Sequence, residues 1–220
     1  MRRIHWEPAC RIVPTRHPTV YLFDRVAGPE DFDALYALEA LTNDRVREEV
    51  GALALVPERD RIFGPGSGPI MAAFTHLNPL GSRFSDGSYG VFYAAGDRAT
   101  AIAETRFHHA RFLAATRVPP MSLPMRLYHV AIDARLHDLR GAGVVDAAVY
   151  DPDSYAVSQA LGRALRQQDS AGVVYRSVRR DGGRCAGLFK PAGARDCLHA
   201  AHLLYVWDGE QFSGVYEEVS

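Results

Sequence analysis

The chain has 220 residues, of which 47% are hydrophobic and 23% are charged, a composition typical of a globular domain. Its 25 basic and 26 acidic residues nearly cancel and form no basic stripe, which argues against nucleic acid as a direct partner. No apolar run is long enough to cross a membrane or to act as a signal peptide, so the sequence predicts one cytoplasmic domain without membrane contact.

The N-terminal part of the chain predicts strands followed by a helix. Residues 10–14 (Cys-Arg-Ile-Val-Pro) and 19–27 (Thr-Val-Tyr-Leu-Phe-Asp-Arg-Val-Ala) are rich in the side chains that strands favour. A Gly-Pro-Glu triplet at 28–30 then begins a helix, because apolar residues recur after it at helical spacing.

The middle of the chain predicts a loop, a short helix, a strand and a longer helix, in that order. Residues 57–69 are dense in glycine and proline, which indicates a loop, and a short helix is predicted at 70–75. The strand is predicted at 89–95, and Asp97 is a suitable N-cap for a helix that continues to about residue 115.

The rest of the chain is mostly strand. Residues 125–133 alternate like a half-buried strand, and Asp151 followed by Pro152 predicts the start of a helix. An Asp-Gly pair at 208–209 predicts a C-terminal hairpin over about residues 202–219. Because strands and helices do not alternate regularly, the predicted fold class is α+β. Further strands are predicted at 172–178, 185–190, 202–207 and 212–219.

The most informative stretch is 81–104, a polar loop that leads through a short apolar strand into a helix. It places Arg83 on the loop, Tyr93 on the strand and Glu104 on the helix. An arginine can hold a phosphate, a tyrosine can stack on an aromatic ring, and a carboxylate can stabilise a cation, a combination that suits NAD. Each residue also has a plain structural interpretation: a surface arginine, a core tyrosine and a solvated helix carboxylate.

The other sequence patterns are weaker indications of a functional site. The glycine-rich run at 64–69 lacks the P-loop and Rossmann signatures and predicts only a loop. His108 and His109 are adjacent, so on a helix they diverge by about 100° and form a poor metal pair. The three scattered cysteines have no zinc-site spacing, and no metal is predicted. Ser177, inside a predicted strand, is either a cross-strand hydrogen bonder or part of a site.

Taken in order, four segments resemble the RES domain family: Ser82-Arg83-Phe84, 91–95 (Val-Phe-Tyr-Ala-Ala), 100–104 (Thr-Ala-Ile-Ala-Glu) and 172–177 (Gly-Val-Val-Tyr-Arg-Ser). The resemblance covers about residues 20–189 and implies one RES-type domain over 1–220. The family is named for an arginine, a glutamate and a serine, whose counterparts are Arg83, Glu104 and Ser177. Tyr93 matches its strand tyrosine, and Arg25 looks like its early arginine.

The match departs from the family signature near Arg83. Ser82 stands between Gly81 and Arg83, where the signature has arginine directly after glycine, and Ser85 replaces an asparagine. The contact with the ribose is therefore expected to differ in detail.

The resemblance implies an ADP-ribosyltransferase-like β core with flanking helices, and an enzyme that consumes NAD as hydrolase, phosphorylase or protein ADP-ribosyltransferase. Arg83 would hold the phosphates or the ribose, and Tyr93 would stack on nicotinamide. Glu104 would stabilise the ribosyl cation, and Ser177 would orient Glu104 or the ribose. The remaining NAD contacts are expected from Arg25, Phe84 and Ser85.

The resemblance also implies a toxin that an Xre-type helix-turn-helix antitoxin neutralises, with a protein as a possible target of ADP-ribosylation. Two alternatives stay open. One is a metal-independent ribonuclease toxin that uses His76 or His129 with arginines, and the other is a non-catalytic binding module. Loss of NAD on incubation with the protein separates the three.

Overall fold

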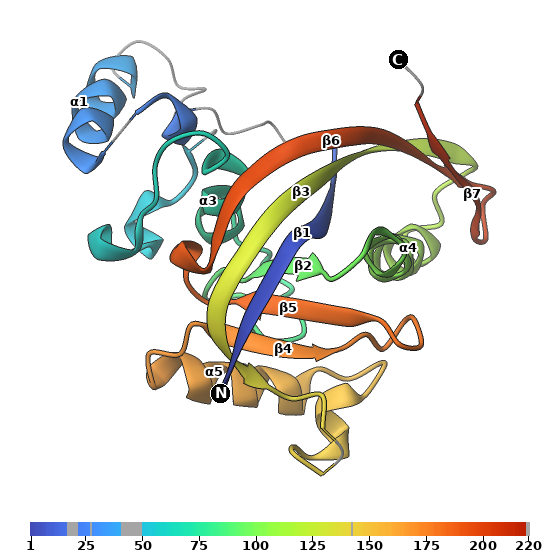
Figure 1. Cartoon of the computed structure of the whole chain (residues 1–220). Coiled ribbons are helices and arrows are strands. Elements are labelled where there is room, and N and C mark those ends of the chain that lie inside the picture. Colours follow the sequence, from blue (N-terminus) through green and yellow to red (C-terminus); the bar gives the residue numbers. More distant parts are fainter. Residues whose placement is uncertain (17–21, 27, 41–49, 142, 219–220) are drawn as a thin grey trace.

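The computed structural model describes residues 1–16, 22–26, 28–40, 50–141 and 143–218 (Figure 1). Its α-helices are α1 (Pro29–Ala40), α3 (Gly68–Thr75), α4 (Arg98–Ala115) and α5 (Ala156–Gln167). Its strands are β1 (Arg2–Pro14), β2 (Phe92–Ala95), β3 (Met121–Asp138), β4 (Gly172–Arg176), β5 (Arg184–Leu188), β6 (Ala194–Trp207) and β7 (Phe212–Glu217). The mixture of one sheet with separate helices confirms the predicted α+β class.

The described strands form one mixed sheet in the order β1-β2-β5-β4-β3-β6-β7. The long strand β3 is central, since it pairs antiparallel with β1 and β6 and parallel with β4. The additional β1–β3 pairing closes β1, β2, β5, β4 and β3 into a ring, from which β6 and β7 extend. Figure 1 shows β1, β3 and β6 as a curved layer, with β4 and β5 beneath it. β1 also pairs with β2, where Cys10 lies opposite Ala95.

Both faces of the sheet are buried at β4. In β4, Val174 belongs to the apolar cluster around α3, whereas its neighbours Val173 and Tyr175 belong to the cluster that α4 and α5 cover. A strand that is buried on both faces needs a continuous apolar run, which explains the Gly-Val-Val-Tyr sequence. Each fully buried valine stabilises the fold by about 1.5–3 kcal/mol. The sheet is therefore a rigid support for groups at the ends of β2 and β4.

The predicted strand at 19–27 is wrong where the structure describes it. Phe23–Arg25 form a 3-10 helix, and residues 19–21 and 27 lie outside the described ranges. Phe23 is fully buried, and its ring stacks on Phe32 with 4.7 Å between centroids. Asp24 Oδ1 accepts a hydrogen bond from the N–H of Gly68 at 2.6 Å. These tertiary contacts outweigh the local strand propensity of the segment.

Two predicted helix starts have different outcomes. Asp97 caps α4 as predicted, because its Oδ1 accepts a hydrogen bond from the N–H of Thr100 at 2.8 Å. The predicted start at Asp151 is wrong, since α5 begins five residues later. The Asp151 carboxylate instead accepts hydrogen bonds from the N–H groups two and three residues further on, at 2.8 and 2.7 Å, and forms a turn. None of the described helices is long and apolar enough to span a membrane.

Candidate functional site

A cleft of about 650 Å³ lies between β1, β2 and α4. The loop that precedes β2 and the segment that precedes α5 complete its wall. Arg83, Tyr93 and Glu104 all line it, so the structure brings these predicted residues to one cavity. Ser177 follows β4 and reaches the same place through a hydrogen bond to Glu104.

Ser177 holds the Glu104 carboxylate in a fixed direction. The Ser177 N–H donates to Gly183 O at 2.9 Å, which closes the connection from β4 to β5. The Ser177 Oγ accepts hydrogen bonds from the N–H groups of Arg179 and Arg180, at 3.0 Å each. Because these donors occupy the lone pairs of the oxygen, the hydroxyl hydrogen points to Glu104 Oε1, 2.6 Å away. The carboxylate thus receives a short, charge-assisted hydrogen bond.

The thiol of Cys185 and the imidazole ring of His108 lie beside Glu104. Cys185 Sγ is 3.8 Å from Oε1, and burial, assisted by the nearby carboxylate, raises the pKa of this thiol well above its usual value. His108 Nε2 is 4.0 Å from Oε2, and burial lowers the pKa of His108 although Glu104 acts in the opposite direction. Both groups are therefore mainly neutral at pH 7. The Glu104 side chain is 20% exposed, and its charge faces the cleft.

Arg83 is more deeply engaged than an ordinary loop arginine. Its side chain is buried, and Nη1 donates hydrogen bonds to the carbonyl oxygens of Val149 and Asp151, at 3.1 Å each. The guanidinium also lies 4.6 Å from the centre of the Tyr155 ring. Arg83 therefore ties its loop to the segment before α5, and only part of its fork faces the cleft.

Tyr93 supports the Arg83 loop from β2. Its hydroxyl oxygen accepts a hydrogen bond from the N–H of Phe84 at 2.9 Å and lies 2.9 Å from Ser82 Oγ. Burial raises the pKa of Tyr93 far above its usual value, so the phenol stays protonated. The ring lines the cleft, while the hydroxyl fixes the loop that carries Arg83.

Three further predicted NAD contacts do not line this cleft, although Ser85 lines a neighbouring cavity of about 370 Å³. Phe84 is fully buried and packs edge-on against Tyr175, with 5.0 Å between centroids. Ser85 is also buried, and its Oγ donates to the carbonyl of Tyr89 at 2.5 Å. Arg25 is exposed on a 3-10 helix and does not line the cleft. The packing of the loop explains the placement of Phe84 and Ser85, and the helical turn explains that of Arg25.

Arg11 is a cleft residue that the sequence interpretation missed. It lies on β1, its Nη1 donates to the carbonyl oxygen of Tyr93 at 2.9 Å, and its guanidinium lies 4.5 Å from the centre of the Phe92 ring. Burial lowers the pKa of Arg11 below its ordinary value, although an arginine remains charged at pH 7. The sequence signal for this residue was that Arg11 is the single cationic residue in the apolar run 10–14.

One comparison with known proteins identifies a family, and two others find similar chains. A model of the RES domain matches residues 60–208, more than half of the chain. The uncharacterized protein y4oC of Sinorhizobium fredii is 29% identical over 209 residues, which cover 94% of this chain and 85% of the relative. The crystal structure of the M. tuberculosis MbcT–MbcA toxin–antitoxin complex matches with a TM-score of 0.49 and 13% identity, over 98% of this chain and 86% of that chain.

The range matched by the RES model includes some of the predicted site residues and excludes another. Arg83, Tyr93, Glu104 and Ser177 lie within it, whereas Arg25 lies outside it. Since this range includes the loop, β2, α4 and β4, it contains most of the wall of the cleft. The chain therefore belongs to the RES domain family.

Proposed function

We propose that this chain is the toxin of a toxin–antitoxin pair, and that it binds NAD in the cleft and breaks the bond between nicotinamide and ribose. The observation that carries the proposal is the Glu104 carboxylate, which Ser177 holds at 2.6 Å beside a cleft that also contains Arg83. Membership of the RES family supports the toxin role, because the resemblance to that family implies a toxin that consumes NAD.

The chemistry requires a fixed negative charge. The nicotinamide nitrogen of NAD is cationic, so the ring departs as a neutral molecule when its bond to ribose C1′ breaks. The electron pair of that bond goes to nitrogen, and the positive charge passes to the ribose. A carboxylate that is held in place stabilises such an oxocarbenium-like cation. An acceptor oxygen then attacks C1′ and loses its proton, and no general acid is needed for the leaving group.

The cleft has room and charge for a dinucleotide. A second cavity of about 370 Å³ shares Arg11, Ser82 and Tyr93 with the cleft, so the two form one surface along β1 and β2. Guanidinium groups match the pyrophosphate of NAD in shape and charge. Arg11 lines both cavities, so it is the guanidinium that we assign to the phosphates together with Arg83.

The antitoxin is proposed to act by covering this cleft. An Xre-type partner could insert an acidic side chain or a terminal carboxylate near Arg83 and exclude the phosphates of NAD. Analysis of the reaction products identifies the acceptor of ADP-ribose, which is water, phosphate or a target protein.

Incubation of the purified chain with NAD tests the proposal. We expect release of nicotinamide, measured by chromatography with mass spectrometry. Free ADP-ribose identifies water as acceptor, ADP-ribose 1″-phosphate identifies phosphate, and a mass increase on a protein identifies a transferase. NAD that stays intact in the presence of all three acceptors, with folded protein, would contradict the proposal.

The ribonuclease alternative has weaker support in the structure. His129 is exposed on β3 and does not line the cleft. His76 lines the second cavity, and its Nδ1 lies 3.1 Å from Thr75 Oγ1. His76 and Glu104 line different cavities. RNA cleavage without NAD loss in the same preparation would favour the ribonuclease instead.

Replacing Ser177 with alanine is expected to lower the turnover of NAD by about tenfold to a hundredfold, the loss typical of one hydrogen bond to a charged group. The affinity for NAD should change much less, because Ser177 contacts Glu104 and does not line the cleft. Steady-state kinetics separate the two effects, with the exposed Ser213→Ala as control. An equal turnover in Ser177→Ala and Ser213→Ala would remove Ser177 from the mechanism.

Replacing Arg11 with leucine is expected to weaken NAD binding by about tenfold or more, because a charge-assisted contact to phosphate is lost. Arg11→Lys should recover only part of this loss, since an ammonium cannot bond to the Tyr93 carbonyl and to phosphate with a planar fork. Calorimetric titration with NAD measures the effect, and an unchanged affinity in Arg11→Leu would show that Arg11 serves only the packing of β1 on β2.

A further inference from the structure

His108 lies in the cleft one helical turn after Glu104. The two residues are four positions apart on α4, so their side chains share one face of the helix. Among the described residues, His108 is the one histidine that lines the cleft, and about half of its side chain is exposed. Its ring lies 6.3 Å from that of Tyr155, centroid to centroid, and Tyr155 also faces Arg83. The imidazole is therefore open to a molecule that is bound beside Glu104.

The two oxygens of the Glu104 carboxylate have different neighbours. Ser177 Oγ donates to Oε1 at 2.6 Å, and Cys185 Sγ lies 3.8 Å from the same oxygen. Oε2 lies 4.0 Å from His108 Nε2, which is too far for a direct hydrogen bond. Two atoms at that separation can both lie about 2.8 Å from one hydroxyl oxygen. The geometry therefore allows one acceptor hydroxyl to contact the carboxylate and the imidazole together.

His108 is mainly neutral at pH 7, so its ring can accept a proton. Partial burial lowers its pKa below the ordinary value of 6.5, although the Glu104 carboxylate acts in the opposite direction. The other charged groups that face the ring are guanidinium groups, which lower the pKa further: Arg179 after β4, Arg83 before β2 and Arg111 on α4. A neutral imidazole is the usual general base of enzymes.

We propose that His108 is the general base that takes the proton from the acceptor, and that the acceptor is a neutral hydroxyl group, of water or of a side chain. This inference rests on the NAD cleavage proposed above. As the acceptor oxygen bonds to C1′ of the ribosyl cation, its O–H bond breaks and the proton passes to the ring nitrogen of His108. A proton on Glu104 would remove the charge that stabilises the cation, whereas an ionised Glu104 also stabilises the imidazolium that results. A phosphate dianion needs no base for this step.

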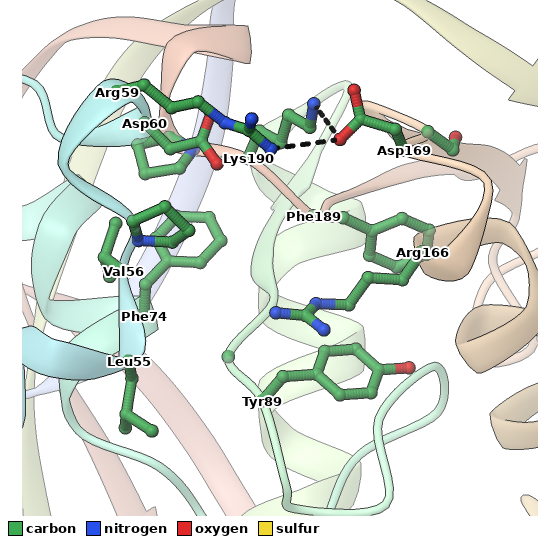
Figure 2. A pocket seen from close by; sticks show the side chains of 14 residues that line it. Leu55, Val56, Arg59, Asp60, Phe74, Tyr89, Arg166, Asp169, Phe189 and Lys190 are labelled. Atoms are coloured by element: carbon green, nitrogen blue, oxygen red, sulfur yellow. Dashed lines mark ion pairs between the residues drawn. The ribbon is translucent and has the colours of Figure 1, made fainter.

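The pocket in Figure 2 differs from the cleft in its ionisable groups. It has a volume of about 220 Å³ and shares no lining residue with the cleft. Lys190 and Arg59 lie 2.6 and 4.0 Å from Asp169 Oδ1, as the dashed lines mark. Within the described part of the chain, no histidine lines this pocket. The imidazole that the proton transfer requires is therefore found in the cleft and not there.

The test compares hydrolysis of NAD with the exchange of labelled nicotinamide into NAD. Both reactions break the same bond, but nicotinamide attacks C1′ without giving up a proton, so only hydrolysis needs the base. In His108→Gln we expect hydrolysis to fall by about a hundredfold and exchange to change little. His109→Gln is the matched control, since His109 is the next residue of α4 and does not line the cleft. Equal hydrolysis by the two variants, or a parallel loss of hydrolysis and exchange in His108→Gln, would overturn the role of His108.

The pH profile of hydrolysis is a second readout, which does not depend on exchange. Below the pKa of His108 the wild-type rate should fall about tenfold per pH unit, because an imidazolium cannot accept a proton, and His108→Gln should lack this dependence. An equal pH dependence in folded His108→Gln, or ADP-ribose 1″-phosphate as the main product in phosphate buffer, would overturn the proposal. NAD that stays intact with the wild type would instead contradict the proposed cleavage itself.

Discussion

Replacing Glu104 with glutamine is expected to lower the rate of NAD cleavage by about two orders of magnitude or more. Glutamine keeps the size of the side chain and can still accept the hydrogen bond from Ser177, at 2.6 Å in the native protein. What it removes is the negative charge that would stabilise the ribosyl cation. The affinity for NAD should change little, because the charge acts in the transition state more than in the bound substrate.

Nicotinamide release under saturating NAD measures this effect. Glu210→Gln, in the exposed turn between β6 and β7, is the matched control and should keep full activity. The same variants can be compared by growth of cells that express each without an antitoxin: wild type and Glu210→Gln should deplete NAD and arrest growth. A folded Glu104→Gln protein with wild-type turnover would exclude the carboxylate from the mechanism.

Replacing Arg83 with alanine is expected to lower both the stability of the fold and the affinity for NAD. The substitution leaves the carbonyl oxygens of Val149 and Asp151 without their donor, which costs about 1–3 kcal/mol of unfolding free energy. It also removes the stacking on Tyr155 and a cation from the cleft. Arg83→Lys should recover only part of both losses, because an ammonium has no planar fork.

Urea unfolding measures the first effect, and NAD titration in a Glu104→Gln background measures the second without consuming the ligand. Arg163→Ala is the control, because its ion pair with Asp86 is exposed and should contribute no more than about 1 kcal/mol. If Arg83→Ala unfolds at the same urea concentration as wild type, the two hydrogen bonds do not stabilise the loop. If NAD binding is also unchanged, Arg83 has no role in the cleft.

The sequence predicted best the features that depend on local chemistry. The cap of α4 follows from the acceptor in the Asp97 side chain, and the C-terminal hairpin follows from an Asp-Gly pair, which the structure shows as the turn between β6 and β7. The segment at 19–27 failed because Phe23 is fixed by its stacking on Phe32 and not by its neighbours in the chain. No single-sequence pattern contains that contact.

In the candidate site, too, the sequence identified some residues, and only the fold could reveal others. Glu104 and Arg83 could be selected because their residue types and spacing resemble a family, and both line the cleft. Arg11 could not be placed, because only the pairing of β1 with β2 brings it to the Tyr93 carbonyl. Phe84 was assigned to the substrate from its position beside Arg83, but its ring packs against Tyr175 in the core.

The pairing of β1 with β3 has a consequence for the order of events during translation. The β3 partners of β1 begin at Met125, so at 5–20 residues per second the β1–β3 pairing can form only roughly 5–20 s after β1 is made. Ser177 emerges 73 residues after Glu104, its hydrogen-bond partner. A nascent or prematurely terminated chain that ends before β4 therefore has neither the closed ring nor the fixed carboxylate. Such a fragment is therefore expected to lack the NAD cleavage that we propose for the folded chain.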